Sequence, residues 1–175
     1  MPNNLVLLGF MGVGKTTLGR LAAVMLGTDF IDLDEKIEED TGLSIPTIFE
    51  TYGEQWFRDF EHATLESLQN LSGCVIAVGG GAPCQPENVE LIRSLGLRVL
   101  LTAEPESILE RVQPIESRPL LAKASDPSKR IETLMQQRMP WYRQADRELR
   151  TDGITPEEGA SRLVEMYMEW MTQGG

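Results

Sequence analysis

The sequence has few of the residues that build disulfide frameworks or metal sites. Its 175 residues include two cysteines and one histidine. Cys74 and Cys84 are ten positions apart, which matches neither a Cys-x-x-Cys redox motif nor the spacing of zinc ligands. We therefore expect two reduced thiols, as is usual in the cytoplasm.

Long apolar runs and an excess of positive charge are also missing. No apolar run approaches the roughly 18 residues that a membrane helix needs, and the first residues lack the basic start and cleavage site of a signal peptide. The 16 Lys and Arg residues are outnumbered by 27 Asp and Glu, which gives a net charge of −11. Such a surface repels nucleic acids and anionic membranes. We expect a cytoplasmic protein with neither as a partner.

What remains is the composition of an ordinary globular protein, with 41% hydrophobic and 25% charged residues. A chain of this length can bury about 70% of the surface that it exposes when unfolded, so it needs no disulfide or metal to hold its core. We expect one domain over residues 1–175.

The pattern of apolar residues predicts strands that alternate with helices. Strands are expected at residues 4–9, 29–32, 74–78 and 97–102, and a weaker one at 148–151. Helices are expected at about 15–27, 34–40, 53–71, 87–95 and 128–145, and also from about 104 and from 156, with a loop or short helix at 41–52. This alternation predicts an α/β fold of three layers, α/β/α, around a parallel sheet.

Two further segments have less regular patterns. Residues 112–127 contain three prolines and no clear periodicity, which predicts a mobile loop. Met166, Met168 and Met171 lie close together on the last predicted helix, and we expect them to fill the core.

Residues 9–16, Gly-Phe-Met-Gly-Val-Gly-Lys-Thr, match the P-loop pattern between a predicted strand and a predicted helix. Glycines let the backbone N–H groups turn toward phosphate oxygens, and the helix N-terminus adds positive potential. We expect Lys15 to reach the β- and γ-phosphates and the Thr16 hydroxyl to bind Mg²⁺. The residues predicted to hold the phosphates are Gly12, Val13, Gly14, Lys15, Thr16 and Thr17.

A P-loop enzyme needs an acidic residue to complete its magnesium site. The strand at 74–78 ends in glycines, so Asp32, at the end of the second strand, is the expected supplier, with Asp34 two residues on. One carboxylate would serve the metal and the other a substrate hydroxyl, as phosphoryl transfer to an alcohol requires. The alternative is that both carboxylates only cap the next helix.

Glycines and arginines complete the candidate site. Gly79, Gly80 and Gly81 follow a predicted strand, where missing side chains would let backbone N–H groups approach a ligand closely. Four arginines fall in segments expected at the same rim: Arg58, Arg111, Arg118 and Arg138. Arg118 lies in the predicted mobile loop, from which it could meet a transition-state charge on closure. We interpret His62 as a surface residue.

These residues together resemble the shikimate kinase family over nearly the whole chain. The matching elements are residues 9–16, Asp32-Leu33-Asp34, Phe57-Arg58-Asp59-Phe60-Glu61, Gly79-Gly80-Gly81, Arg118-Pro119-Leu120-Leu121, and Arg138 with Tyr142. The resemblance implies transfer of the γ-phosphoryl group of ATP to the 3-hydroxyl of shikimate, in aromatic amino acid biosynthesis. It also implies a monomer of the nucleoside monophosphate kinase type, with a five-stranded parallel sheet in the order 2-3-1-4-5 and a lid at about 112–124.

The resemblance further implies a role for each site residue. Asp34 would hold the reacting hydroxyl and act as the base, Lys15 and Arg118 would stabilise the transferring group, and Thr16 and Asp32 would organise Mg²⁺. Shikimate would be bound by Arg58, Arg138 and the three glycines, Gly79, Gly80 and Gly81. Glu61 would orient Arg58, and Phe49 and Phe57 would shape the pocket. Arg111 and Pro156 would enclose the adenine of ATP.

Other functions stay open at this point. A related kinase, such as a gluconate kinase, shares the P-loop but should lack the set formed by Arg58, the glycines and Arg138. A nucleotide-dependent binding switch of the GTPase type would need an Asn-Lys-x-Asp segment, and none of the four lysines lies in one. A catalytically dead relative would lack one or more of the expected catalytic residues, and all of those positions are filled in this sequence.

Overall fold

The computed structural model describes residues 2–112, 121 and 124–174. In chain order its elements are β1 (Asn4–Gly9), α1 (Lys15–Leu26), β2 (Phe30–Asp32), α2 (Leu33–Thr41), α3 (Ile45–Thr51), α4 (Gly53–Ser67), β3 (Val75–Ala77), the 3₁₀ turns η1 (Ala82–Cys84) and η2 (Pro86–Asn88), α5 (Val89–Ser94), β4 (Gly96–Thr102), α6 (Pro105–Arg111), α8 (Pro127–Tyr142), β5 (Arg147–Arg150) and α9 (Pro156–Thr172). Every predicted strand is present.

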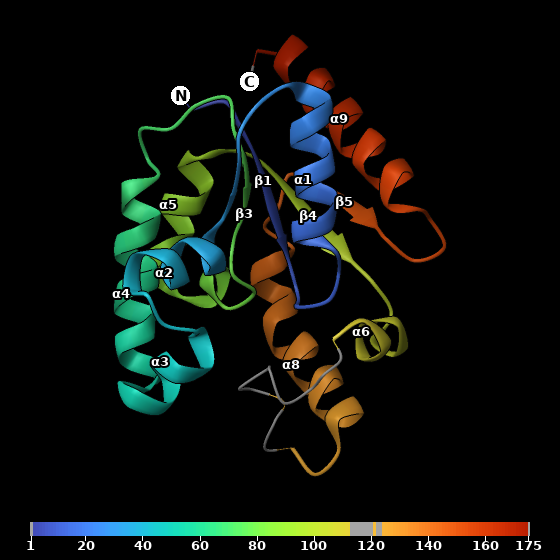
Figure 1. Cartoon of the computed structure of the whole chain (residues 1–175). Helices are drawn as coiled ribbons and strands as arrows, with labels where there is room; N and C mark the ends of the chain where they lie inside the picture. The colour runs from blue at the N-terminus through green and yellow to red at the C-terminus, as the bar shows by residue number, and fades with distance from the viewer. Residues whose placement is uncertain (1, 113–120, 122–123, 175) are drawn as a thin grey trace.

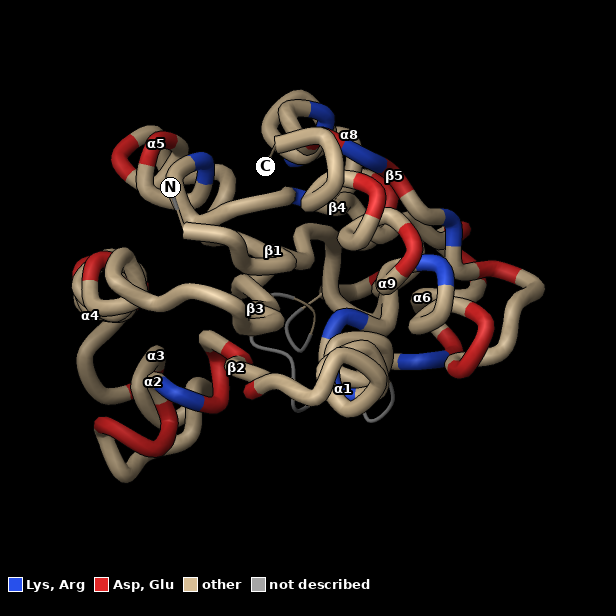
Figure 2. Tube along the Cα trace, turned by 90° about the horizontal axis from the view of Figure 1, so that it is seen from above, with Lys and Arg blue, Asp and Glu red and all other residues tan. Residues whose placement is uncertain are grey.

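The strands form one parallel sheet in the order β2-β3-β1-β4-β5, as predicted. Strand β1 is central and buried along its whole length, because α1 and α9 cover one face of the sheet and α4, α5 and α8 the other (Figure 1). Figure 2 shows the same layers end on, with the acidic and basic residues mostly on the outer helices. The continuous apolar run of β1 is what a strand buried on both faces requires.

Parallel pairing brings the carboxyl ends of the strands to one edge of the sheet. Residues Leu5, Val6 and Leu7 of β1 pair with Val75, Ile76 and Ala77 of β3, and β3 pairs in turn with β2. The P-loop after β1, Asp32 at the end of β2 and the glycines after β3 therefore meet at this edge. This is the edge at which open α/β sheets bind ligands.

Two helix ends differ from the sequence predictions, and so do two methionines that were expected in the core. Helices α4 and α8 end about three to four residues earlier than expected, because the N–H groups that follow bond to carbonyls three residues back and tighten the chain into turns. Met168 and Met171 are 52% and 39% exposed, so the prediction that they fill the core is wrong. Helix α9 packs through Ala160, Leu163 and Tyr167, and Met168 follows that face by one residue, about a quarter turn away.

The predicted lid, at about 112–124, falls mostly outside the described residues. Of that segment, Val112 and Leu121 are described and buried. Within the described ranges, no helix is long and apolar enough to cross a membrane.

Asn4 ties the opposite edge of the sheet together. Its side chain is fully buried, donates to the carbonyls of Leu71 and Leu95 at 2.9 and 2.8 Å, and accepts from the N–H of Cys74 at 3.0 Å. Asn4 is the first residue of β1, and its side chain thereby links the start of this strand to the segments that precede β3 and β4.

We expect Asn4→Ala to lower the free energy of unfolding by about 3 kcal/mol, because a fully buried side chain loses its three hydrogen bonds to the backbone. Urea unfolding measures the change. Asn3→Ala is the matched control, since the Asn3 side chain bonds only the exposed Ser72 among the described residues, and we expect less than about 0.5 kcal/mol. Equal losses in both variants would contradict this role for Asn4.

Candidate functional site

The P-loop can take its shape only because glycines stand at its sharp turns. Gly9, Gly12 and Gly14 have φ angles of 137°, 76° and 101°, which side-chain-bearing residues rarely adopt. At Gly9 a Cβ would also lie 2.4 Å from the carbonyl oxygen of Leu101. Helix α1 begins directly after Gly14 with no side-chain cap, so its first N–H groups are available to an anion.

Lys15 and Thr16 are held by hydrogen bonds to the P-loop and to the end of β2. The Lys15 ammonium donates to the carbonyls of Gly9 and Phe10 at 2.9 and 3.0 Å, so it lies across the loop that it closes. The Thr16 hydroxyl donates to Asp32 Oδ2 at 2.7 Å. The two residues predicted to share a magnesium ion are therefore in direct contact.

Asp32 uses its two oxygens differently. Oδ1 accepts from the N–H groups of Asp34 and Glu35 and caps α2, while Oδ2 accepts from Thr16. The capping alternative is thus correct for Asp32 but incomplete. Asp34 is not the cap residue of α2, and its carboxylate faces the cavities described next.

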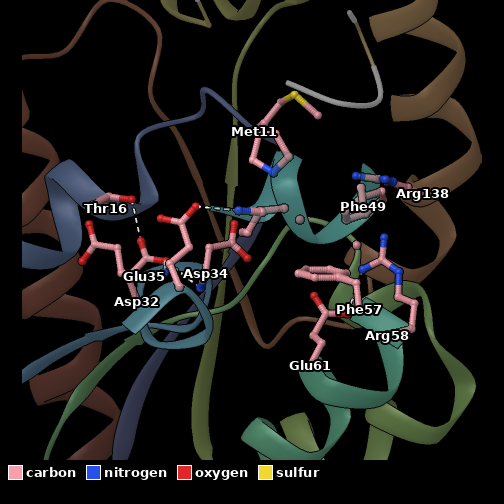
Figure 3. A pocket seen from close by; sticks show the side chains of 15 residues that line it. Met11, Thr16, Asp32, Asp34, Glu35, Phe49, Phe57, Arg58, Glu61 and Arg138 are labelled. Carbon is pink, nitrogen blue, oxygen red and sulfur yellow. Dashed lines mark hydrogen bonds and ion pairs between the residues drawn. The ribbon is translucent and has the colours of Figure 1, made fainter. Parts of the chain in front are cut away.

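Asp34 lies at the junction of two cavities. The inner cavity has a volume of about 340 Å³ and is lined by Met11, Thr16, Asp32, Asp34, Glu35, Glu38, Ile45, Pro46, Phe49, Phe57, Arg58, Glu61, Gly80, Gly81 and Arg138. The P-loop cavity, of about 370 Å³, is lined by Met11, Gly12, Gly14, Lys15, Thr16, Thr17, Asp32, Asp34, Val78, Gly80 and Arg111. In Figure 3 the carboxylates of Asp32, Asp34 and Glu35 lie on one side of the inner cavity, and Arg58 and Arg138 on the other.

A buried ion pair forms part of the wall of the inner cavity. Arg58 and Glu61, 9% and 1% exposed, lie one turn apart on α4, and Arg58 Nη1 donates to Glu61 Oε2 at 2.8 Å. Glu61 Oε1 and Arg58 Nε are buried with no hydrogen-bond partner among the described residues. Burial raises the pKa of Glu61 to about 7, although the charge of Arg58 opposes the shift and that of Asp34 adds to it.

Two of the three glycines after β3, Gly79 and Gly81, are needed for close approach, and none of the three is needed for its backbone angles. None of them has a positive φ. A Cβ on Gly79 would lie 2.6 Å from Asp34 Oδ1 and 2.9 Å from Glu61 Oε1, and one on Gly81 would lie 2.6 Å from Arg58 Nη1. Protein side chains, rather than a ligand alone, therefore occupy the space that the missing side chains leave.

Aromatic rings support the cationic side of the cavity. Phe49 and Phe57 contact each other with centroids 4.9 Å apart, and the Arg58 guanidinium lies 5.1 Å from the Phe57 ring. The Arg138 guanidinium lies 5.5 Å from the ring of Phe10. Such cation–π contacts limit the movement of both arginines.

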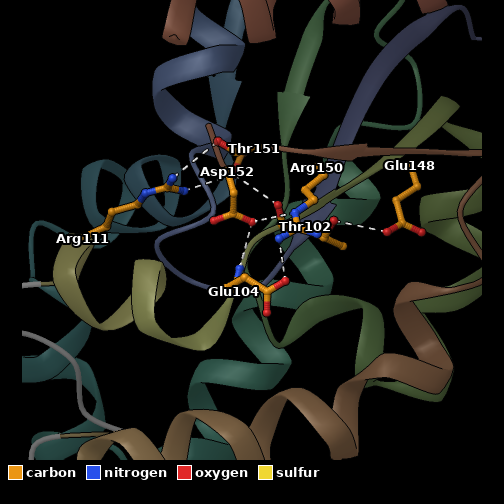
Figure 4. A network of polar contacts seen from close by, with 7 residues as sticks. All are labelled: Thr102, Glu104, Arg111, Glu148, Arg150, Thr151 and Asp152. Carbon is orange, nitrogen blue, oxygen red and sulfur yellow. Dashed lines mark hydrogen bonds and ion pairs between the residues drawn. The ribbon is translucent and has the colours of Figure 1, made fainter. Parts of the chain in front are cut away.

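Arg111 lies at the far side of the P-loop in a third, rim cavity of about 310 Å³, lined by Val13, Gly14, Thr17, Leu18, Arg111, Thr151, Ile154, Thr155 and Pro156. Its guanidinium donates to the Thr151 hydroxyl at 3.0 Å, and that hydroxyl donates to the carbonyl of Thr102 (Figure 4). Asp152 accepts from the N–H of Glu104 and from Arg150 in the same network. These bonds join the ends of β4 and β5 to α6 and so fix Arg111 beside the P-loop.

The P-loop cavity shares lining residues with each of the other two, and we call the three cavities together the trough. Arg118, the remaining predicted site residue, lies outside the described residues. His62 was interpreted as a surface residue; it is 33% exposed, and its Nδ1 lies 2.7 Å from Oδ1 of the buried Asn88.

Sequence comparison identifies the family to which the chain belongs. The sequence model described as Shikimate kinase matches residues 11–168. The chain belongs to the shikimate kinase family. Curated shikimate kinases from Thermodesulfovibrio yellowstonii and Caldicellulosiruptor saccharolyticus are 43% and 44% identical to it, over 94% of this chain and 94% and 95% of their own lengths. Shikimate kinases are ATP-dependent kinases that act on a hydroxyl of shikimate, and ATP is the co-substrate here.

Solved shikimate kinases have the same fold. The Acinetobacter baumannii enzyme, in complex with shikimate, superposes with a TM-score of 0.91 at 36% identity, over 97% of this chain and 94% of that one. The Aquifex aeolicus enzyme gives a TM-score of 0.82 at 34% identity, over 98% and 99%.

Some lining residues of this shikimate kinase were not predicted from the sequence. Glu38 lies one helical turn after Asp34 on α2, a spacing that could have indicated a shared face. Its Oε1 accepts from the N–H of Ile45 at 2.8 Å and so holds the start of α3 beside the cavity. Thr155 is the cap of α9, and the capping box that it forms with Glu158 was readable from the sequence.

The raised pKa of Glu61 predicts a pH-dependent stability. A carboxyl group whose pKa is about 7 when folded and 4.5 when unfolded binds more protons in the folded state, so its contribution is complete below pH 4.5 and is lost as pH rises through 7. We expect the free energy of unfolding of the wild type to fall by about 2 kcal/mol relative to Glu61→Gln between pH 5 and pH 8.

Urea unfolding of both proteins at each pH measures this difference, and Asp59→Asn, which changes an exposed carboxylate of the same helix, is the control. Parallel pH profiles for the wild type and Glu61→Gln would contradict the assignment.

Proposed function

We propose that the trough is the active site in which the γ-phosphoryl group of ATP passes to the 3-hydroxyl of shikimate. The observation that supports this most directly is the position of Asp34, whose carboxylate lines both the inner cavity and the P-loop cavity. A hydroxyl bound in the first can therefore meet a phosphate bound in the second next to one carboxylate. We also propose that the chain acts as a monomer of one domain.

The inner cavity has the chemistry to bind shikimate, an anionic polyol. Arg58 and Arg138 offer planar, permanently charged groups for its carboxylate. Glu61 holds Arg58 in place, and the backbone at Gly79, Gly80 and Gly81 offers N–H groups to ring hydroxyls. Phe49 and Phe57 provide the apolar wall against which the ring carbons pack.

The P-loop cavity and the rim cavity would hold ATP. Backbone N–H groups at Gly12, Val13 and Gly14 and at the start of α1 would bind the phosphates, with Thr17 beside them. Lys15 would exchange its hydrogen bonds to the carbonyls of Gly9 and Phe10 for contacts with the β- and γ-phosphates. Arg111 and Pro156 both line the rim cavity and would enclose the adenine.

The side chains of Thr16 and Asp32 are suited to bind a magnesium ion. A hydroxyl and a carboxylate 2.7 Å apart are hard oxygen donors, and Mg²⁺ in nucleotide sites takes few protein ligands and keeps water and phosphate for the rest. When bound, the ion would neutralise charge on the transferring phosphoryl group.

Asp34 would orient the acceptor hydroxyl and take its proton as the bond to phosphorus forms. Lys15 would stabilise the negative charge on the phosphoryl oxygens, and we assign the same role to Arg118 from the sequence. Most of the rate acceleration would come from positioning and electrostatic stabilisation, as is usual for phosphoryl transfer.

A coupled assay of ADP release tests the substrate. We expect ADP formation to depend on shikimate and not on gluconate, the substrate that the alternative kinase reading implies. ADP release that shikimate does not change would contradict the proposed function.

The role of Asp34 is tested by Asp34→Asn, which keeps the size of the side chain but removes the base. We expect kcat to fall by about 100- to 10,000-fold while the affinity for ATP changes less than about threefold, because the lost group acts on the acceptor. Asp40→Asn, on the exposed side of the same helix, is the control and should keep normal kcat. Near-normal turnover in Asp34→Asn would show that Asp34 is not the base.

A further inference from the structure

The hydroxyl of Tyr142 contacts Arg138 and Gly80, and the reaction scheme above uses neither contact. Tyr142 is the last residue of α8, it is 2% exposed, and its hydroxyl donates to the carbonyl oxygen of Gly80 at 2.6 Å. Burial raises the pKa of this hydroxyl further above its usual value, so it stays a donor at any pH at which the enzyme works. The contact with Gly80 joins α8 to the glycine segment after β3.

The bond to Gly80 also determines where the next N–H points. A peptide group is planar and trans, so its C=O and N–H point in opposite directions. Because Tyr142 holds the carbonyl of Gly80, the N–H of Gly81 points away from the Tyr142 hydroxyl. Gly80 and Gly81 line the inner cavity, whereas Tyr142 is not among its lining residues.

The glycine segment needs such an external restraint. Glycine has the widest choice of backbone conformations, and at Gly79 and Gly81, on either side of Gly80, side chains are excluded by Asp34, Glu61 and Arg58. The tyrosine therefore supplies, from another helix, the orientation that the segment cannot set by itself.

The same helix carries Arg138. Arg138 and Tyr142 are four residues apart, which places them on one face of α8. A Cβ on Gly80 would lie 3.5 Å from Arg138 Nη1, so the arginine and the glycine peptide are immediate neighbours at the cavity wall. The bond from Tyr142 thus fixes the spacing between the cation on α8 and the backbone after β3.

We propose that Tyr142 is a positioning residue for the acceptor substrate, which through the carbonyl of Gly80 aims the Gly81 N–H into the inner cavity and sets its distance from Arg138. The inference rests on the proposed function, in which this cavity binds shikimate.

The test compares two variants that each lose one tyrosine hydroxyl. Tyr142→Phe removes the bond to Gly80 and the interaction of the same hydroxyl with the Arg138 guanidinium. Tyr167→Phe removes a similar bond, from a largely buried tyrosine to the carbonyl of Asn3 at 2.5 Å, at the opposite edge of the sheet. For both, the KM for shikimate, the KM for ATP and the Tm are measured.

We expect Tyr142→Phe to raise the KM for shikimate about tenfold, the loss of roughly one well-placed hydrogen bond, and to leave the KM for ATP within about twofold. Tyr167→Phe should lower the Tm by about as much as Tyr142→Phe does, and it should change neither KM. An unchanged KM for shikimate in Tyr142→Phe, or equal rises in both KM values, would overturn the inference.

A measurement on the wild type keeps the proposal testable if Tyr142→Phe does not fold. In ¹H–¹⁵N NMR spectra, titration with shikimate should shift the amide signal of Gly81 and leave that of Gly73, on the opposite edge of the sheet, in place. A Gly81 signal that does not respond would overturn the inference. If the wild type shows no shikimate-dependent ADP release, both the proposed function and this inference are overturned. If the wild type is active and Tyr142→Phe has the same KM values as the wild type, this inference alone is overturned.

Discussion

The parallel pairing of the sheet is the constraint on which the site depends. Because β1 pairs with β3 and β3 with β2, three chain segments leave the sheet at the same edge. One supplies the P-loop, one Asp32 and one the glycines. The hydrogen bond between Thr16 and Asp32 links two of them, and the bond from Tyr142 to Gly80 links the third to α8. The sheet therefore assembles in three dimensions a site whose lining residues run from Met11 to Pro156.

Charge is distributed unevenly around this edge. The chain carries a net charge of −11, yet it binds an anionic nucleotide. Lys15, Arg58, Arg111 and Arg138 all line the trough, and the uncapped start of α1 adds further positive potential. Net charge acts at long range, whereas donors at contact distance decide the binding of a small anion. An acidic surface can therefore exclude nucleic acids without excluding ATP.

Much of the fold followed from local patterns. The strands, the buried first strand and the P-loop were predicted from the residues, because glycine spacing and apolar runs act over a few residues, whereas the strand order was predicted only from the resemblance to the family. The errors concern longer-range effects. Met168 was expected in the core, but its neighbour Tyr167 occupies the buried face of α9. His62 was interpreted as a surface residue, and its contact with Asn88, 26 positions away, was not predicted. Such a contact has no signature in either local segment.

The sequence by itself determined that the chain has a P-loop, which acids and arginines stand near it, and which family it resembles, since these depend on residue type and spacing. Only the tertiary structure decided how the parts meet. It placed Asp34 between two cavities, filled the space beside Gly79 and Gly81 with Asp34, Glu61 and Arg58, and brought Tyr142 to Gly80. The physical reason is that close packing fixes distances between side chains from different elements, and no local pattern encodes those distances.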